Sequence, residues 1–100
     1  MTLKTKIKEL SEKYFDDILK IRRHLHQHPE LSYEEYQTSE FIKSELNKIG
    51  VSYQTLFNTG ITGELHGNSS GPVIALRADI DALPIQEKND VSYKSVNDGV

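Results

Sequence analysis

The segment from Val73 to Pro84 constrains the fold of this chain more than any other part of the sequence. It begins with four consecutive apolar residues, which predict a β-strand covered on both of its faces. The strand is expected to end before Pro84, because proline cannot donate a hydrogen bond within a central strand. Asp79 and Asp81 lie near the carboxyl end of this strand, where open α/β sheets place their active-site crevices.

The two aspartates have two interpretations on this pattern alone. Side chains two residues apart on a strand point to the same face, so the two negative charges repel each other at short range. A divalent cation held by such a doublet would make it a functional site. Pairing of one carboxylate with Arg77 would instead make it part of the scaffold.

Composition narrows the class of protein. One hundred residues form at most one small domain. The net charge of −3 argues against nucleic acid or an anionic membrane as the main partner. The absence of cysteine excludes a disulfide scaffold and a thiolate metal site within these residues. No signal peptide or membrane-spanning segment is visible, so a cytoplasmic protein is expected.

Two helices are expected before the first strand. An amphipathic helix is predicted over residues 5–26, ending before Pro29. Its apolar residues recur at gaps of three and four: Ile7, Leu10, Tyr14, Ile18, Ile21 and Leu25. The stripe of Tyr14, Phe15 and Ile18 is expected to pack in the core. Ser32 and Glu35 have the spacing of a capping box, which predicts that the second helix begins there. Gly50 is the expected left-handed residue at its end.

Strands are predicted after the second helix, over residues 51–56, 61–66 and 72–79. Residues 86–100 show neither a helical nor a strand period and are expected to form a loop-like tail. The order of elements predicts an α/β fold in which two N-terminal helices pack on a mixed sheet. Such a sheet needs further strands and helices to cover residues 73–76. Residues 1–100 are therefore expected to be the incomplete front part of a larger catalytic domain.

Three blocks in the sequence resemble a known family. In order, they resemble the signatures of the metal-dependent aminoacylase and hippurate-hydrolase amidohydrolases, a group that includes the auxin-conjugate hydrolases within the zinc-exopeptidase-like superfamily. The blocks are Arg22–Leu31 with Glu35 and Thr38, Leu76–Ile85 with Glu87, and Ser92–Ser95 leading to Gly99.

The resemblance implies a hydrolase that cleaves the amide bond of a small N-acyl amino acid. In this family two divalent cations, zinc or manganese, activate a shared water and polarise the substrate carbonyl. The family's cysteine, histidine and glutamate ligands and its general base are expected beyond Val100. Residues 1–100 alone are thus expected to hold no metal and to be inactive. The resemblance also implies a homodimer for the complete enzyme.

The resemblance assigns different roles to the two aspartates. Related exopeptidases carry a His-x-Asp pair at this strand end, and alignment on Pro84 places Asp79 at the histidine position and Asp81 at the aspartate position. Asp81 is therefore the one candidate site residue, with the role of orienting a metal ligand through a hydrogen bond. Asp79 and Arg77 are expected to form a structural pair. No metal ligand is assigned within residues 1–100.

The histidines near Pro29 are expected to be structural. His24 and His28 have a spacing that can bind a metal on one helix face, but Pro29 ends the helix there and no carboxylate or cysteine nearby completes a ligand set. Packing and hydrogen bonding at the helix end is the favoured interpretation for both of them and for His26.

Two other function classes remain open on the sequence. A phosphatase with an aspartate nucleophile would also place an Asp-x-Asp doublet after a buried strand, with Asp79 attacking phosphorus. The two helices before this strand, and Leu83 two residues after Asp81, argue against that class. The second alternative is a non-catalytic domain that retains the scaffold without the metal-binding loop.

Overall fold

The first helix, α1, spans Leu3–Gln27 in the computed structural model, which describes all residues 1–100. Its N-terminus is capped by Thr2, whose hydroxyl accepts a hydrogen bond from the amide of Thr5 at 3.2 Å. His28 is the C-cap residue that follows the helix, directly before Pro29. The helix predicted over residues 5–26 is confirmed, with slightly wider bounds.

The second helix, α2, spans Tyr36–Ile49 and begins later than the sequence predicts. The predicted capping box is wrong, because Glu35 occupies the N-cap position and no side chain at that position caps the helix. The cap comes from outside the helix. The carboxylate of Glu30 accepts the free amides of Gln37 at 3.1 Å and Thr38 at 2.5 Å.

The end of α2 follows the sequence prediction. Gly50 adopts φ 74°, and its amide bonds back to the carbonyl oxygens of Asn47 and Leu46. This is the left-handed conformation that glycine adopts without steric cost. The chain then reverses into the first strand.

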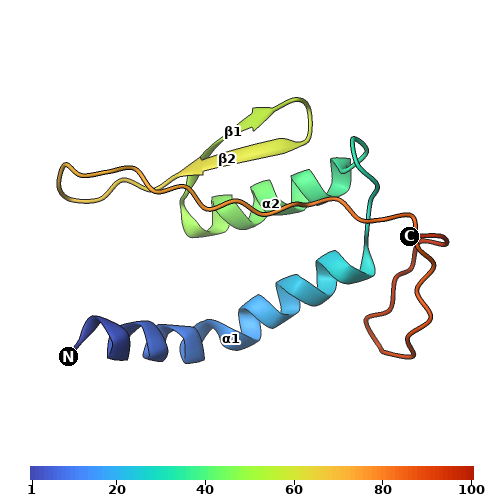
Figure 1. Cartoon of the computed structure of the whole chain (residues 1–100), viewed down its shortest axis with the longest axis horizontal. Coiled ribbons are helices and arrows are strands. Elements are labelled where there is room, and N and C mark those ends of the chain that lie inside the picture. The colour runs from blue at the N-terminus through green and yellow to red at the C-terminus, as the bar shows by residue number, and fades with distance from the viewer.

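A two-stranded antiparallel hairpin follows α2 and packs against it (Figure 1). Strand β1 spans Ser52–Leu56 and strand β2 spans Gly60–Glu64, within two residues of the predicted bounds. The turn between them is held by a buried hydrogen bond of 2.9 Å from the Thr59 hydroxyl to the Glu35 carboxylate. A Cβ at position 60 would lie 2.8 Å from the Leu56 carbonyl oxygen, so glycine is required there.

The third predicted strand, over residues 72–79, does not form. Val73, Ile74 and Leu76 are 97%, 82% and 97% exposed, so the prediction of a doubly covered strand is wrong for this chain. The reason is the lack of a neighbouring strand: no main-chain group of residues 65–81 hydrogen-bonds to another main-chain group. The only parallel pairing is an isolated bridge between Leu31 and Ala82.

The helices do not enclose an apolar core. No hydrophobic residue is buried, and the four buried residues are all polar: Glu35, Thr38, Ser39 and Thr59. The stripe of Tyr14, Phe15 and Ile18 on α1 is predicted to pack in the core, yet these side chains are 47%, 61% and 61% exposed. That prediction is wrong because no other element covers this part of α1, which projects away from the rest of the chain (Figure 1).

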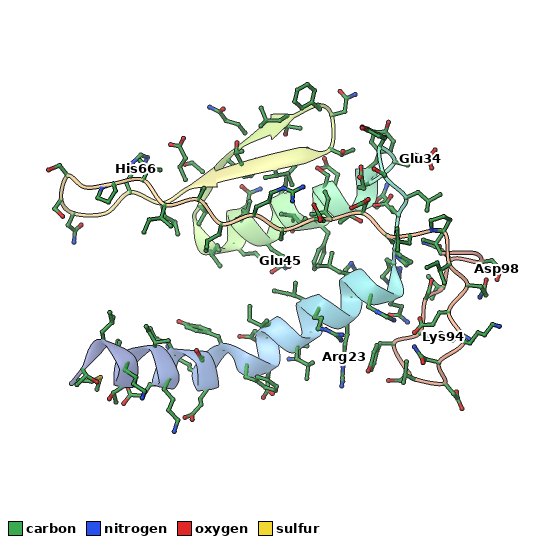
Figure 2. The ribbon with its side chains drawn as sticks, in the orientation of Figure 1. Arg23, Glu34, Glu45, His66, Lys94 and Asp98 are labelled. Atoms are coloured by element: carbon green, nitrogen blue, oxygen red, sulfur yellow. The ribbon has the colours of Figure 1, made fainter.

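The C-terminal residues 86–100 form turns without helix or strand, as predicted. They fold back beside the C-terminal end of α1, and Figure 2 shows Lys94 and Asp98 in this loop.

The order of helices and strands confirms the α/β class, with α2 between α1 and the hairpin (Figure 1). Neither helix is long and apolar enough to cross a membrane.

The cap of α2 gives a first test. Replacing Glu30 with Ala should reduce the free energy of unfolding by about 0.5–2 kcal/mol, because two amides at the helix start lose their acceptor. Ser32→Ala is the matched control and should leave stability nearly unchanged. Urea unfolding followed by circular dichroism measures both. A large loss for Ser32→Ala together with none for Glu30→Ala would restore the capping box.

Candidate functional site

A cavity of about 450 Å³ lies where the end of α1, the start of α2 and two segments near the C-terminus meet. The end of α1 contributes Leu25 and His26, and α2 contributes Thr38. Pro29 also lines the cavity, and the remaining lining comes from two segments near the C-terminus, residues 79–89 and residues 95–100. Asp79 and Asp81 line this cavity together with His26 at the end of α1.

Glu87 is the most highly connected side chain in the cavity. Its carboxylate lies 2.8 Å and 3.0 Å from Nε2 of His26 and accepts the amide of Ser95 at 2.7 Å. A third donor is the side-chain amide of Asn89 at 3.1 Å. The side chain of Glu87 is only 9% exposed.

These contacts change the acidity of Glu87. The hydrogen bond from the Ser95 amide, then those from His26 and Asn89, lower the pKa of Glu87 from about 4.5 to about 2. All of these donors favour the ionised carboxylate. Glu87 is therefore charged at neutral pH and fully engaged by protein donors.

An aromatic residue supports the same corner of the cavity. The ring of Tyr93 lies edge-on to His26 at 5.6 Å between centroids, and the guanidinium of Arg23 lies 4.6 Å from the Tyr93 ring centre. Both Arg23 and His26 come from α1. The cation–π contact and the edge contact hold the loop against the helix.

Further hydrogen bonds fasten the C-terminal loop to the chain after α1. The amide of Val96 donates to the carbonyl of Gln27 at 2.9 Å, and the side-chain amide of Asn97 donates to the carbonyl of Pro29 at 2.8 Å. Closer to the end, the amide of Gly99 donates to the Gln86 side chain at 2.6 Å. The loop therefore has a defined position although it contains no regular secondary structure.

Asp79 and Asp81 line the same cavity but have different partners. Asp79 forms an ion pair with Arg77, Oδ1 to Nη2 at 2.7 Å, which confirms the predicted pairing. Both members are largely exposed, so the pair contributes little to stability. Asp81 is exposed and takes part in none of the ion pairs or side-chain hydrogen bonds of the structure.

The three histidines at the end of α1 pack as predicted. His24 stacks on Phe41 of α2 with 4.0 Å between ring centroids, and His28 lies 4.7 Å from His24 in a tilted arrangement. His26 pairs with Glu87. The stacking of His24 on Phe41 is an aromatic contact between the two helices.

The described residues do not fit a metal centre by themselves. No group of three or more histidine, aspartate or glutamate side chains lies close enough to hold a metal ion. Asp79 is engaged by Arg77, and His26 and Glu87 engage each other. Asp81 alone remains as a free carboxylate in the cavity, and one carboxylate is too few for a tight site.

The central position of Glu87 was missed by the sequence analysis. In the sequence, Glu87 and Ser95 belong to the second and third resemblance blocks, but nothing there predicts a contact between them. His26 and Glu87 are 61 residues apart, so no local spacing links them. The sequence offers one sign of such a loop: Glu87, Asn89 and Ser95 follow Pro84 in a segment rich in turn-forming side chains.

Over most of its length this chain is similar to part of two larger bacterial proteins that are named as a hydrolase and a deacetylase. An uncharacterized hydrolase of Staphylococcus haemolyticus is 54% identical over 83 residues, and N-acetyl-L-cysteine deacetylase of Bacillus subtilis is 51% identical over 84 residues. Each alignment covers 83% of this chain. The chain spans about a fifth of the length of these relatives, 21% and 20%. No protein-family model matches.

A solved structure gives the same relationship in three dimensions. The crystal structure of the Bacillus subtilis YXEP protein, a dinuclear metal binding peptidase from the M20 family, matches with a TM-score of 0.83 and 40% identity. The match covers 88% of this chain and 25% of that chain. The resemblance drawn from the sequence blocks is therefore confirmed.

The acidity of Glu87 predicts how stability depends on pH. The folded pKa lies below the unfolded value, so the stabilisation is complete above about pH 4.5 and is lost as pH falls toward 2. Unfolding curves of the parent and of Glu87→Gln should therefore differ by a constant amount above pH 4.5 and converge toward pH 2. The exposed Glu64→Gln is the control and should follow the parent at every pH. A difference that persists unchanged at pH 2 would contradict the assignment.

Proposed function

The chain is related over most of its length to hydrolases, one of them an M20-family dinuclear metal binding peptidase, and from this premise we propose that it is part of a metal-dependent amidohydrolase. The reaction is hydrolysis of the amide bond of an N-acyl amino acid or a similar small amide. The single observation that carries the proposal is 51% identity to N-acetyl-L-cysteine deacetylase over 83% of the chain.

Residues 1–100 form the first part of the catalytic domain in this proposal. The exposed apolar residues of the Val73–Leu76 segment and of α1 support it, because elements of this kind are covered in a complete α/β domain. The aligned 83 or 84 residues make up only 21% and 20% of these relatives, which are about four times as long as this chain, so there is room for the missing layers.

Two divalent cations, zinc or manganese, supply an activated water and polarise the substrate carbonyl in the proposed enzyme. In this proposal the ligands come from residues outside 1–100, because residues 1–100 contain no cluster of three side chains that could bind a metal ion. Asp81 has a positioning role here: its free carboxylate accepts a hydrogen bond from a ligand and fixes that ligand's orientation. The carboxylate lies in the cavity and has no competing partner, which supports this role.

The finer properties follow from the same relationship. The substrate is a small N-acyl amino acid and not a nucleic acid, in keeping with the net charge of −3. The complete enzyme is a cytoplasmic homodimer in this proposal.

The activity is tested by assaying the whole protein that carries residues 1–100 with N-acetyl and N-benzoyl amino acids. Hydrolysis should require zinc or manganese and stop on chelation, because the attacking water depends on the metal. Residues 1–100 expressed alone should bind no stoichiometric metal after dialysis and release no product. Absence of hydrolysis by the metal-loaded whole protein, or turnover by residues 1–100 alone, would refute the proposal.

The aspartate doublet is tested by a matched pair of substitutions in the whole protein. Asp81→Asn should lower metal affinity or activity by about 10–100-fold with little change in stability, because a ligand loses its acceptor. Asp79→Asn should keep nearly full activity and lose at most ~1 kcal/mol of stability, because its pair with Arg77 is exposed. Turnover, metal titration and thermal unfolding are measured for both. A fully active Asp81→Asn or an inactive, stable Asp79→Asn would reverse the two roles.

A further inference from the structure

We propose that Glu87 is a positioning residue: its carboxylate fixes the loop of residues 88–100 against the cavity that contains Asp79 and Asp81. The inference rests on the proposed hydrolase function, and it assigns to this residue the task of setting the shape of the site. Glu87 acts in this role through residues of its own chain and does not contact the substrate.

Three donors from separate places converge on this one carboxylate. His26 approaches from the end of α1 at 2.8 Å, the amide of Ser95 approaches from the loop at 2.7 Å, and Asn89 approaches from the intervening turn at 3.1 Å. The side chain of Glu87 is 9% exposed, so water competes weakly for these bonds. Hydrogen bonds to an ionised acceptor are roughly twice as strong as neutral ones.

The contact with Ser95 determines where the rest of the loop lies. The two residues that follow Ser95 also hydrogen-bond to the end of α1 and the chain after it. The amide of Val96 donates to the carbonyl of Gln27, and the side chain of Asn97 donates to the carbonyl of Pro29. Ser95 and Val100 then line the cavity together with the two aspartates. Release of Ser95 would therefore change the wall of the cavity that Asp79 and Asp81 also line.

The role requires a carboxylate and not merely a polar side chain. An ionised carboxylate is an acceptor at both oxygens, so it serves a ring nitrogen and two amides at once. A glutamine of the same size has one acceptor oxygen and turns two N–H groups toward the remaining donors. Glu87→Gln is therefore a minimal change that breaks the arrangement without removing volume.

The experiment compares Glu87→Gln with the parent and with Glu64→Gln in the whole protein. Glu64 undergoes the same chemical change on the exposed end of β2, where its carboxylate lies 3.5 Å from His66. For Glu87→Gln we expect kcat to fall about 10–100-fold with KM nearly unchanged, because a misplaced site wall disturbs the reacting geometry. A merely structural role would lower the melting temperature and leave kcat of the folded enzyme unaffected.

Hydrogen exchange adds a readout that does not depend on activity. The amides of Ser95 and Val96 should exchange roughly tenfold faster or more in Glu87→Gln, while amides of α2 keep their protection. If Glu87→Gln does not fold, His26→Phe provides the second variant. It keeps a ring against Tyr93 but removes one donor, and it should accelerate the same amides and lower kcat by a smaller factor.

The outcomes separate the two proposals. An inactive parent refutes the hydrolase function, and unchanged exchange at Ser95 and Val96 in Glu87→Gln then refutes the holding of the loop as well. An active parent with full kcat in both Glu87→Gln and Glu64→Gln overturns the positioning role alone. Equal losses in the two variants also overturn it, because the effect would then not depend on the contacts of Glu87.

Discussion

The contacts of Glu30 hold the structure together at the point where its main parts meet. Its side chain caps α2 through the amides of Gln37 and Thr38, and its carbonyl accepts the amide of Ala82 at 2.8 Å. One residue thus joins the chain after α1, the start of α2 and the segment that follows Asp79 and Asp81. The neighbouring residue Leu31 pairs with Ala82 in the isolated parallel bridge. The cavity exists because these parts converge there.

Polar contacts of this kind carry the arrangement because apolar burial does not. Every fully buried residue is polar, and the large apolar side chains of the 73–76 segment remain almost completely exposed. Burial of such a side chain ordinarily contributes about 1.5–3 kcal/mol, and that contribution is absent here. The positions of the helices, the hairpin and the C-terminal loop therefore depend on directional hydrogen bonds, chiefly those to Glu30, Glu35 and Glu87.

Local features of the fold could be predicted from the sequence, and non-local ones could not. The bounds of α1, the glycine at the end of α2 and the hairpin follow from neighbouring residues, and the structure agrees with them. The start of α2 could not be predicted, because its cap comes from Glu30, which lies outside the helix. The strand over residues 72–79 failed for a similar reason, since a strand needs a partner as well as a suitable composition.

The same distinction applies to the candidate site. The pairing of Asp79 with Arg77 involves residues two apart and was predicted, whereas the pairing of Glu87 with His26 spans 61 residues and was not. A pattern of spacings detects contacts within a helix turn or along a strand. Such spacings cannot detect a loop that folds back onto the end of a distant helix. The loop of residues 86–100 does so here, and it forms part of the cavity wall.

The carboxylates of the cavity divide into those with partners and one without. Glu87 is held by three donors and Asp79 by Arg77, so further contacts by either would have to displace bonds already made. Asp81 has no such partner and faces the same cavity. A free carboxylate beside a fixed wall can accept a donor without rearrangement, and this lowers the cost of ordering that donor. Glu87 and Asp79 are thus engaged within the chain, whereas the carboxylate of Asp81 is free to accept a further donor.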